Sequence, residues 1–135
     1  MIRIALDEDM EFLKRNSHIS ENVISRKIEW EEIFVAEIKE NLIGFLQLEY
    51  LWSSVPYISL IKVLPDYQRQ GIGKSLLKFA EDFLRDKNFK SLYSSSQADE
   101  FEPQAWHRHI GFEECGIIAG INDGIGEIFF VKKLL

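Results

Sequence analysis

The stretch YISLIKVLPDYQRQGIGKSLLKFAEDFL, residues 57–84, contains the local patterns from which the fold can be worked out. Its first part, Ile58–Val63, mixes Ile, Leu and Val over the length of a strand, and Pro65 ends that strand because proline cannot donate to a β-ladder. From Gly73 onward apolar residues recur at helical spacing, with charged residues on the opposite face. The stretch therefore predicts a strand, a glycine-rich turn and an amphipathic helix.

The turn between them, Gln68–Gly73, has the composition of a phosphate-binding loop. Its two glycines, Gly71 and Gly73, allow positive φ and leave backbone N–H groups uncovered. These N–H groups stand at a helix N-terminus, where the aligned peptide dipoles favour an anion. The alternative is an ordinary glycine-bearing turn that binds nothing.

Spacing excludes two common nucleotide-binding motifs. A Walker A loop, G-x-x-x-x-G-K-[ST], would need its first glycine where the chain has Gln68. A dinucleotide-binding G-x-G-x-x-G would need a third glycine where the chain has Leu76. What remains is [QR]-x-x-G-x-[GA] after V-x-P, and the residues that match it are Val63, Pro65, Tyr67, Gln68, Gly71 and Gly73.

In this motif the chain resembles the GNAT superfamily of acyl-CoA-dependent N-acetyltransferases. The expected order of elements, β-α-α-β-β-β-α-β-α-β-β, also resembles those enzymes over nearly the whole chain. The resemblance implies a single α/β (α+β) domain over residues 1–135, with a mixed, mostly antiparallel sheet of about seven strands flanked by about four helices. In that fold two central parallel strands splay apart, and the acyl-CoA thioester lies between them.

Hydrophobic periodicity and turn residues place the elements. The expected strands are Met1–Leu6, Ile33–Ile38, Leu42–Tyr50, Tyr57–Val63, Ser91–Ser95, Glu113–Ile118 and Gly126–Leu134. The expected helices follow Asp7 or Asp9, follow Ser20 as far as about Ile28, begin at Gly73, and begin at Pro103 and end at Gly111. The turn-rich segment Gly120–Gly124 should join the last two strands.

Charge and composition narrow the function classes. Sixteen Lys and Arg against 22 Asp and Glu give a net charge of −6, the wrong sign for binding the nucleic-acid backbone. The chain has no apolar leader and no apolar stretch of membrane-spanning length, so we expect a cytoplasmic protein without a membrane partner. The single cysteine, Cys115, excludes an intrachain disulfide and is expected to be buried in a strand.

The resemblance implies that acetyl-CoA is the cosubstrate and that no metal is needed. Backbone N–H groups of the glycine turn would hold the pyrophosphate, and the backbone of Ile61–Val63 would hold the pantetheine arm. Lys74 is equally well explained as a solvated lysine, because its charge opposes the helix dipole. The turn residues expected to contact acetyl-CoA are Gln68, Arg69, Gln70, Gly71, Gly73, Lys74 and Ser75.

A second segment, Ala105–Phe112, resembles the family's helix that ends in Gly-Phe near the CoA thiol. Four residues before Gly111, where many members carry a tyrosine that protonates the leaving thiolate, this chain has His107. An imidazolium of pKa ~6.5 is a competent acid toward a thiolate of pKa ~8.5, so His107 is a candidate general acid. The alternative is a packed or solvent-facing helical histidine.

An attacking amine must lose a proton, and Glu49 is the candidate carboxylate that receives it. The alternative is that Glu49 is a polar strand residue that faces solvent and has no catalytic part. Aromatic residues near the expected thioester would wall an acceptor pocket; they are Trp30, Tyr50, Trp52 and Tyr57. The same rings are equally typical of a core or a dimer contact, so a homodimer stays open.

The resemblance implies transfer of an acetyl group from acetyl-CoA to a primary amine by direct attack, and we expect the acceptor to be a small molecule. The negative net charge favours a cationic acceptor and argues against a nucleic-acid partner. The same preference is supported by the glutamates expected near the acceptor, which are Glu31, Glu32, Glu37 and Glu49. Two alternatives remain: acetylation of protein N-termini or lysines, and a non-catalytic acyl-CoA-binding sensor module.

Overall fold

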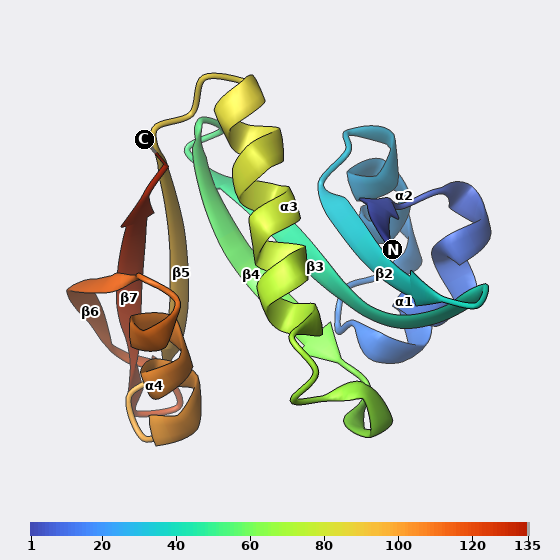
Figure 1. The fold of residues 1–135 in the computed structure, drawn as a ribbon. Coiled ribbons are helices and arrows are strands. Elements are labelled where there is room, and N and C mark those ends of the chain that lie inside the picture. Colours follow the sequence, from blue (N-terminus) through green and yellow to red (C-terminus); the bar gives the residue numbers. More distant parts are fainter. Residues whose placement is uncertain (135) are drawn as a thin grey trace. The chain divides into compact units, whose positions relative to one another are not determined.

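The computed structural model describes residues 1–134, and the chain divides into two compact units (Figure 1). Unit 1 comprises Met1–Leu48 and Leu60–Asp82, and unit 2 comprises Glu49–Ser59 and the chain from Phe83 onward. Three elements, β3, β4 and α3, contribute residues to both units. None of the helices in the described residues is long and apolar enough to span a membrane.

The strands and helices follow the expected order. The strands are β1 (Ile2–Ile4), β2 (Ile33–Ile38), β3 (Asn41–Leu51), β4 (Val55–Val63), β5 (Ser91–Gln97), β6 (Glu113–Asn122) and β7 (Ile125–Lys133). The helices are η1 (Asp7–Asp9), α1 (Met10–Asn16), α2 (Glu21–Glu29), η2 (Pro65–Tyr67), α3 (Ile72–Asp86) and α4 (Phe101–His109), where η marks a 3₁₀ turn.

The seven strands form one sheet in the order β1-β2-β3-β4-β5-β7-β6. Pairings of β1 with β2, β2 with β3, β5 with β7 and β6 with β7 are antiparallel. Strands β4 and β5 are parallel, with Tyr57 opposite Tyr93 in unit 2. The α3 helix provides the crossover that a parallel pair requires. The predicted mixed, mostly antiparallel α/β sheet with four α-helices is therefore confirmed.

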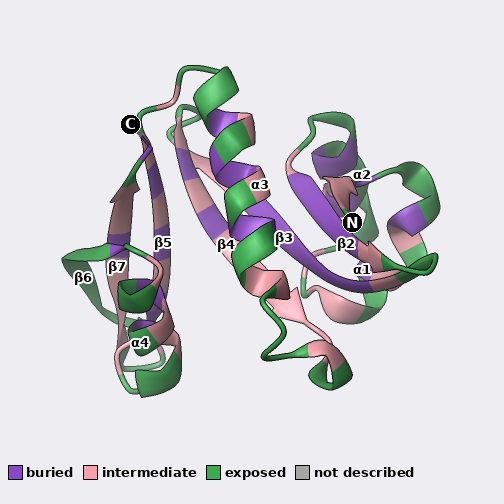
Figure 2. Cartoon of the chain, in the orientation of Figure 1, coloured by how far each residue is buried: buried purple, intermediate pink, exposed green. Residues whose placement is uncertain are grey.

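In unit 1 the core forms on both faces of β2, whose residues Ile33–Ala36 are all buried (Figure 2). One face contributes Ile33 and Val35 to a cluster with apolar residues of α1, α2 and β3, and the ring of Phe12 meets the edge of Phe45 at 6.1 Å. On the other face Phe34 packs against Phe79 of α3 at 5.1 Å. Burial on both faces explains why the β2 sequence shows no polar alternation.

In unit 2 the two faces of β5 differ. Leu92, Ser94 and Ser96 are buried, whereas the residues that alternate with them, such as Ser95, are half-buried. The buried Ser94 contacts α4, and Phe130 of β7 lies opposite it in the ladder. Successive strand residues point to opposite faces, so the side chains of Ser94 and Ser95 lie in different surroundings.

Helix α4 begins two residues before the expected start at Pro103. Glu100 is its N-cap, which places Pro103 as the third helical residue, still within the turn whose N–H groups need no helical acceptor. The helix ends at His109 with Ile110 as its C-cap, and Gly111 follows with φ +100°. The N–H of Phe112 then donates to the His107 carbonyl at 2.9 Å, the bond of a Schellman-type ending.

The closing hairpin departs from the sequence expectation in two respects. The turn is the residue pair Asp123–Gly124, both with positive φ, rather than the whole segment from Gly120. The expectation that Cys115 is buried is wrong, since its side chain is exposed. The reason is its place on β6, which ends the strand order and is exposed over nearly all of its length (Figure 2).

Candidate active site

The glycine-rich turn lies in unit 1 and joins η2 to α3. Arg69 has φ +64° and Gly71 has φ +83°, so the chain passes twice through the left-handed region before α3 begins. The helix starts at Ile72, one residue earlier than expected, and its first hydrogen bond runs from the Ser75 N–H to the Gly71 carbonyl at 3.0 Å. Gly73 is therefore a helical residue, and only Gly71 supplies a left-handed glycine in this turn.

This turn has two features that are typical of a phosphate-binding site. The N–H groups of residues 71–74 precede the first helical bond, so α3 itself offers them no acceptor. A Cβ built on Gly71 would meet no atom within 4 Å, so there is open space beside Gly71 itself. Donors at a helix N-terminus together with open space beside them are what an anionic phosphate requires.

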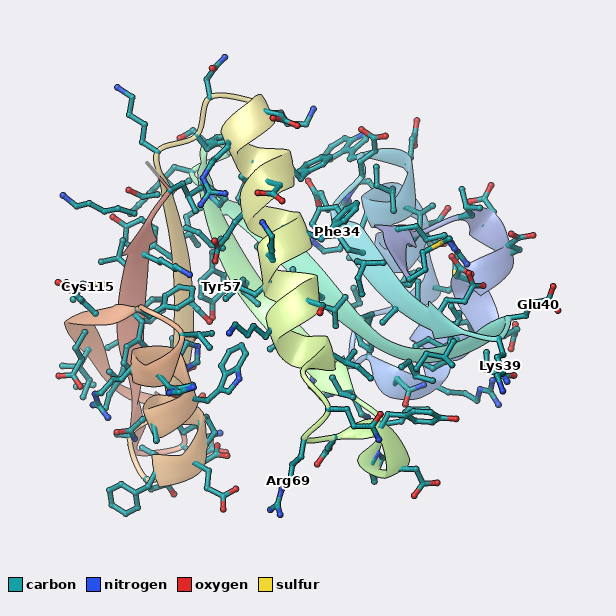
Figure 3. The ribbon with its side chains drawn as sticks, in the orientation of Figure 1. Phe34, Lys39, Glu40, Tyr57, Arg69 and Cys115 are labelled. Carbon is teal, nitrogen blue, oxygen red and sulfur yellow. The ribbon has the colours of Figure 1, made fainter. Side chains whose placement is uncertain are left out.

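Side chains of the same turn hold its shape through bonds to nearby carbonyl groups. Gln68 Nε2 donates to the Val63 carbonyl at 2.9 Å, and Ser75 Oγ donates to the Gly71 carbonyl at 3.1 Å. Gln70 Nε2 donates to the Asp66 carbonyl at 3.4 Å. The exposed cations of the turn are Arg69, whose side chain points away from the ribbon in Figure 3, and Lys74. Ile61 and Val63 are half-buried in β4.

His107 lies in unit 2, with only 4% of its surface exposed. Its Nδ1 lies 2.7 Å from the Pro103 carbonyl and its Nε2 lies 2.7 Å from Ser94 Oγ. A carbonyl oxygen only accepts, so Nδ1 carries the proton, and in the neutral ring Nε2 accepts from the Ser94 hydroxyl. The imidazole also stacks on Phe130, with ring centres 4.6 Å apart and planes 1° from parallel.

These surroundings favour the neutral imidazole. Burial lowers the pKa of His107 below its ordinary value, the Pro103 bond opposes that change, and the Arg108 charge adds to it. Because both ring nitrogens already have partners, a proton donated to a thiolate would have to pass through Ser94 Oγ. The arrangement supports the packed-histidine interpretation, and a general-acid role for His107 stays a prediction.

A hydrogen-bonded chain of three side chains links β4, β5 and β7 in unit 2. Tyr57 Oη lies 2.6 Å from Ser95 Oγ, and Ser95 Oγ donates to Glu127 Oε2 at 2.6 Å. Asn122 Nδ2 donates to the other carboxylate oxygen of Glu127 at 2.8 Å. The Tyr57 ring stacks on Phe129, with ring centres 5.6 Å apart.

Within this hydrogen-bonded chain the pKa of Tyr57, labelled in Figure 3, is shifted. Burial raises the pKa of the Tyr57 phenol, the Ser95 bond opposes the rise, and the negative charges of Glu127 and Glu49 add to it. Glu49, the predicted carboxylate, is thus half-buried in unit 2 and close enough to act electrostatically on Tyr57. The phenol is therefore held in its protonated form at neutral pH.

Sequence reasoning missed Ser95, Asn122 and Glu127. The signal in the sequence was a run of serines on β5 together with one glutamate, Glu127, in the mostly apolar strand β7. It was missed because the pairing of β5 with β7 joins residues 32 positions apart.

The other three predicted acceptor residues have different surroundings. Tyr50 packs on Phe89 at 5.7 Å, and Trp52 is 87% exposed in the turn between β3 and β4. Trp30, in unit 1, is 61% exposed beneath the Arg26 guanidinium. Tyr57 lies within the hydrogen-bonded chain of unit 2.

Two of the glutamates invoked for a cationic acceptor have ion-pair partners. Glu32 binds the buried Lys27 at 3.1 Å, and Glu37 binds Arg3 at 3.5 Å. Their charges are therefore balanced within unit 1. Among residues 1–134, no group of three or more His, Cys, Asp or Glu side chains is arranged to hold a metal ion.

The model of the acetyltransferase (GNAT) family matches residues 3–112. The chain belongs to this family. An aminoglycoside N(6')-acetyltransferase type 1 from Stenotrophomonas maltophilia is 34% identical to this GNAT protein over 62 residues, which cover 46% of the chain and 40% of that relative. The match thus spans less than half of the relative's length.

Solved structures share the fold of this GNAT protein. The ribosomal-protein-S18-alanine N-acetyltransferase from Escherichia coli matches with TM-score 0.81 and 22% identity, covering 99% of this chain and 93% of that one. A Bacillus anthracis protein solved in complex with acetyl coenzyme A matches with TM-score 0.69 and 23% identity, covering 75% of this chain and 61% of that one. At these identities the likeness shows the fold alone.

Proposed function

We propose that the chain transfers the acetyl group of acetyl-CoA to the primary amine of a small molecule, in the cytoplasm and by direct attack of the amine on the thioester. The observation that carries the proposal is the turn before α3, where open space at Gly71 lies beside N–H groups without a helical acceptor. Membership of the acetyltransferase family supports the reaction class.

In this proposal unit 1 binds the nucleotide part of acetyl-CoA. The N–H groups of residues 71–74 donate to the pyrophosphate, and the exposed Arg69 and Lys74 add positive charge at its edge. The Gln68 and Ser75 side chains act indirectly, because each is bonded to a carbonyl that shapes the turn. A backbone N–H of the Ile61–Val63 strand would stabilise the thioester oxyanion, an interaction typically worth ~10²–10³ in rate.

The proposed acceptor is a small cationic amine. Support comes from Glu49 and Glu127, whose charges both act on Tyr57, and from the net charge of −6. The partial match to an aminoglycoside acetyltransferase supports the same class. The competing acceptor is a protein N-terminus, which the fold likeness to a ribosomal-protein acetyltransferase keeps open.

A panel of acceptors tests the proposal. Thiol release from acetyl-CoA is followed with spermidine, an aminoglycoside, a neutral amine, an amino acid and a basic peptide with a free N-terminus. We expect the highest kcat/KM with a small cationic amine, and a fall in that kcat/KM as salt screens the carboxylates. Faster reaction of the peptide, or of a neutral or anionic amine, contradicts the acceptor class.

Isothermal titration with acetyl-CoA separates the enzyme from a sensor. Saturable binding together with turnover of an amine supports the acetyltransferase. Saturable binding without turnover of any acceptor in the panel, including the peptide, supports the non-catalytic acyl-CoA-binding module instead.

A further inference from the structure

The hydrogen bonds of Tyr57, Ser95 and Glu127 have a defined direction. A carboxylate only accepts, so the single proton of Ser95 points to Glu127 Oε2, 2.6 Å away. Ser95 Oγ must then accept from Tyr57, whose hydroxyl lies 2.6 Å from it. The Tyr57 oxygen is left with lone pairs that can accept from a further donor, so the chain has an accepting end at Tyr57 and a carboxylate at its other end.

The same three side chains are held in place from several sides. Asn122 bonds the second oxygen of Glu127 at 2.8 Å, which fixes the carboxylate toward Ser95. Phe129 stacks on the Tyr57 ring and lies opposite Ser95 in the ladder of β5 and β7. All three polar residues are half-buried, so the chain is partly shielded from solvent. Short bonds in a partly desolvated site polarise one another.

We propose that Tyr57, Ser95 and Glu127 form a proton relay that binds the acceptor's ammonium group at the Tyr57 oxygen and carries one of its protons to the Glu127 carboxylate. The inference rests on the proposed function and names the groups that prepare the amine for attack. We call these three side chains the Tyr57 relay.

The proton transfer is balanced. The ammonium N–H gives its proton to the Tyr57 oxygen, Tyr57 gives its own proton to Ser95 Oγ, and Ser95 gives its proton to Glu127. Tyr57 and Ser95 end as neutral hydroxyls, the carboxylate becomes a carboxylic acid, and the ammonium becomes a neutral amine with a free electron pair. That pair forms the new bond to the thioester carbon as the carbon–sulfur bond breaks. A second nitrogen proton ends on the CoA sulfur, and Glu127 returns the first to solvent.

The charges around Tyr57 suit both roles of its oxygen. Glu49 of β3 and Glu127 of β7 both disfavour the phenolate, so the phenol keeps the proton that it must donate. The same two carboxylates attract an ammonium ion to the phenol. The charges of Glu127 and Arg108 also influence the pKa of His107 on α4. Its hydrogen bonds are with Ser94 and Pro103, so His107 is not hydrogen-bonded to any of the three side chains.

Ammonium binding can be tested without turnover. Protein carrying ¹³C at tyrosine Cζ is titrated with ethylammonium chloride, with the Tyr57 signal assigned by Tyr57→Phe. We expect a saturable shift of that signal, at least tenfold weaker apparent affinity in Glu127→Gln, and no comparable response to tetramethylammonium, which has the same charge and no N–H donor. An absent shift, or an equal shift with tetramethylammonium, overturns the proposal.

Kinetics test the proton transfer with the best acceptor from the panel. Tyr57→Phe, Ser95→Ala and Glu127→Gln should each lower kcat by about 10²-fold or more. Acetyl-CoA affinity should be unchanged, and the loss should shrink as the pH is raised toward the acceptor's own pKa. Glu127→Asp should recover part of the rate. Ser96→Ala is the matched control, because the Ser96 hydroxyl is buried on the other face of β5 and has no hydrogen-bond partner among residues 1–134.

The outcomes separate this inference from the proposed function. If the parent acetylates an amine and the three relay variants match it at every pH, the relay is wrong and the proposed function stands. If the parent binds acetyl-CoA but acetylates nothing, the proposed function fails, while the ethylammonium titration still decides whether the Tyr57 site binds a primary ammonium group.

Discussion

His107 shows how one residue can match a family position and yet have a different environment. The family resemblance predicts a general acid at His107, and the structure surrounds this residue with Ser94, Pro103 and Phe130. Nothing local in the sequence predicts this, because Ser94 and Phe130 reach the ring through tertiary packing. Glu127 is a similar case, since its bond to Ser95 depends on the register of two strands.

Burial of His107 predicts a pH-dependent stability. Its pKa is lowered in the folded chain, so below its unfolded value of about 6.5 the unfolded chain binds a proton that the folded chain does not. The free energy of unfolding should therefore fall as the pH drops below about 6.5, and His107 should contribute no pH dependence above that value. Urea unfolding from about pH 5 to pH 8 measures this slope.

The control for this prediction compares two histidines of α4. His107→Phe keeps an aromatic ring beside Phe130 and should flatten the acid-side slope, whereas His109→Phe, at an exposed position, should leave the slope unchanged. Equal slopes in the parent and in His107→Phe would mean that the folded chain protonates His107 as readily as the unfolded chain does.

At the scale of elements, the glycine turn and the strands were predicted best. The caps Ser20 and Gly111 and the turn before α3 are local signals, which depend on a few neighbouring residues. The predicted boundaries were wrong where tertiary contacts determine them. Helix α4 starts two residues earlier than predicted, and β6 continues to Asn122 past a register shift. Cys115 was misplaced because its exposure depends on the strand order of the sheet.

Substitutions at Gly71 separate backbone strain from obstruction of the turn. Gly71→Val forces a β-branched residue to φ +83°, which should destabilise the fold by about 1–2 kcal/mol and abolish acetyl-CoA binding. Gly71→Asn tolerates the left-handed region, so it should fold nearly as stably as the parent yet bind acetyl-CoA at least tenfold more weakly. Isothermal titration and urea unfolding measure both quantities, and parent-like affinity in Gly71→Asn would refute the assignment of the turn.

Gly44 tests the close approach of β3 to β4 in unit 1. A Cβ at this position would lie 2.7 Å from the Lys62 carbonyl oxygen, so Gly44→Ala must push the two strands apart. We expect a loss of about 1–3 kcal/mol in the free energy of unfolding. Gly116→Ala on β6 is the matched control, since its Cβ would meet nothing within 4 Å and should cost little. Equal stability of the two variants would contradict the described spacing.

At the scale of the whole molecule, the order of elements predicted from the sequence is confirmed, and the family match covers residues 3–112. We propose that unit 1 binds the nucleotide and that unit 2 removes the proton. The first of these roles can be predicted from the sequence, because the residues proposed for it are contiguous. The second could not be predicted, because three strands supply its groups one residue at a time.

The central claim is that acetyl-CoA bound through the turn before α3 loses its acetyl group to a small cationic amine. The most direct measurement incubates the protein with acetyl-CoA and the best amine of the panel, then quantifies free CoA thiol and acetylated amine by mass spectrometry. The account predicts that both products form one-to-one in the parent and that both fall together in Gly71→Asn. Release of CoA without acetylated amine, or parent-like formation of both products by Gly71→Asn, would contradict it.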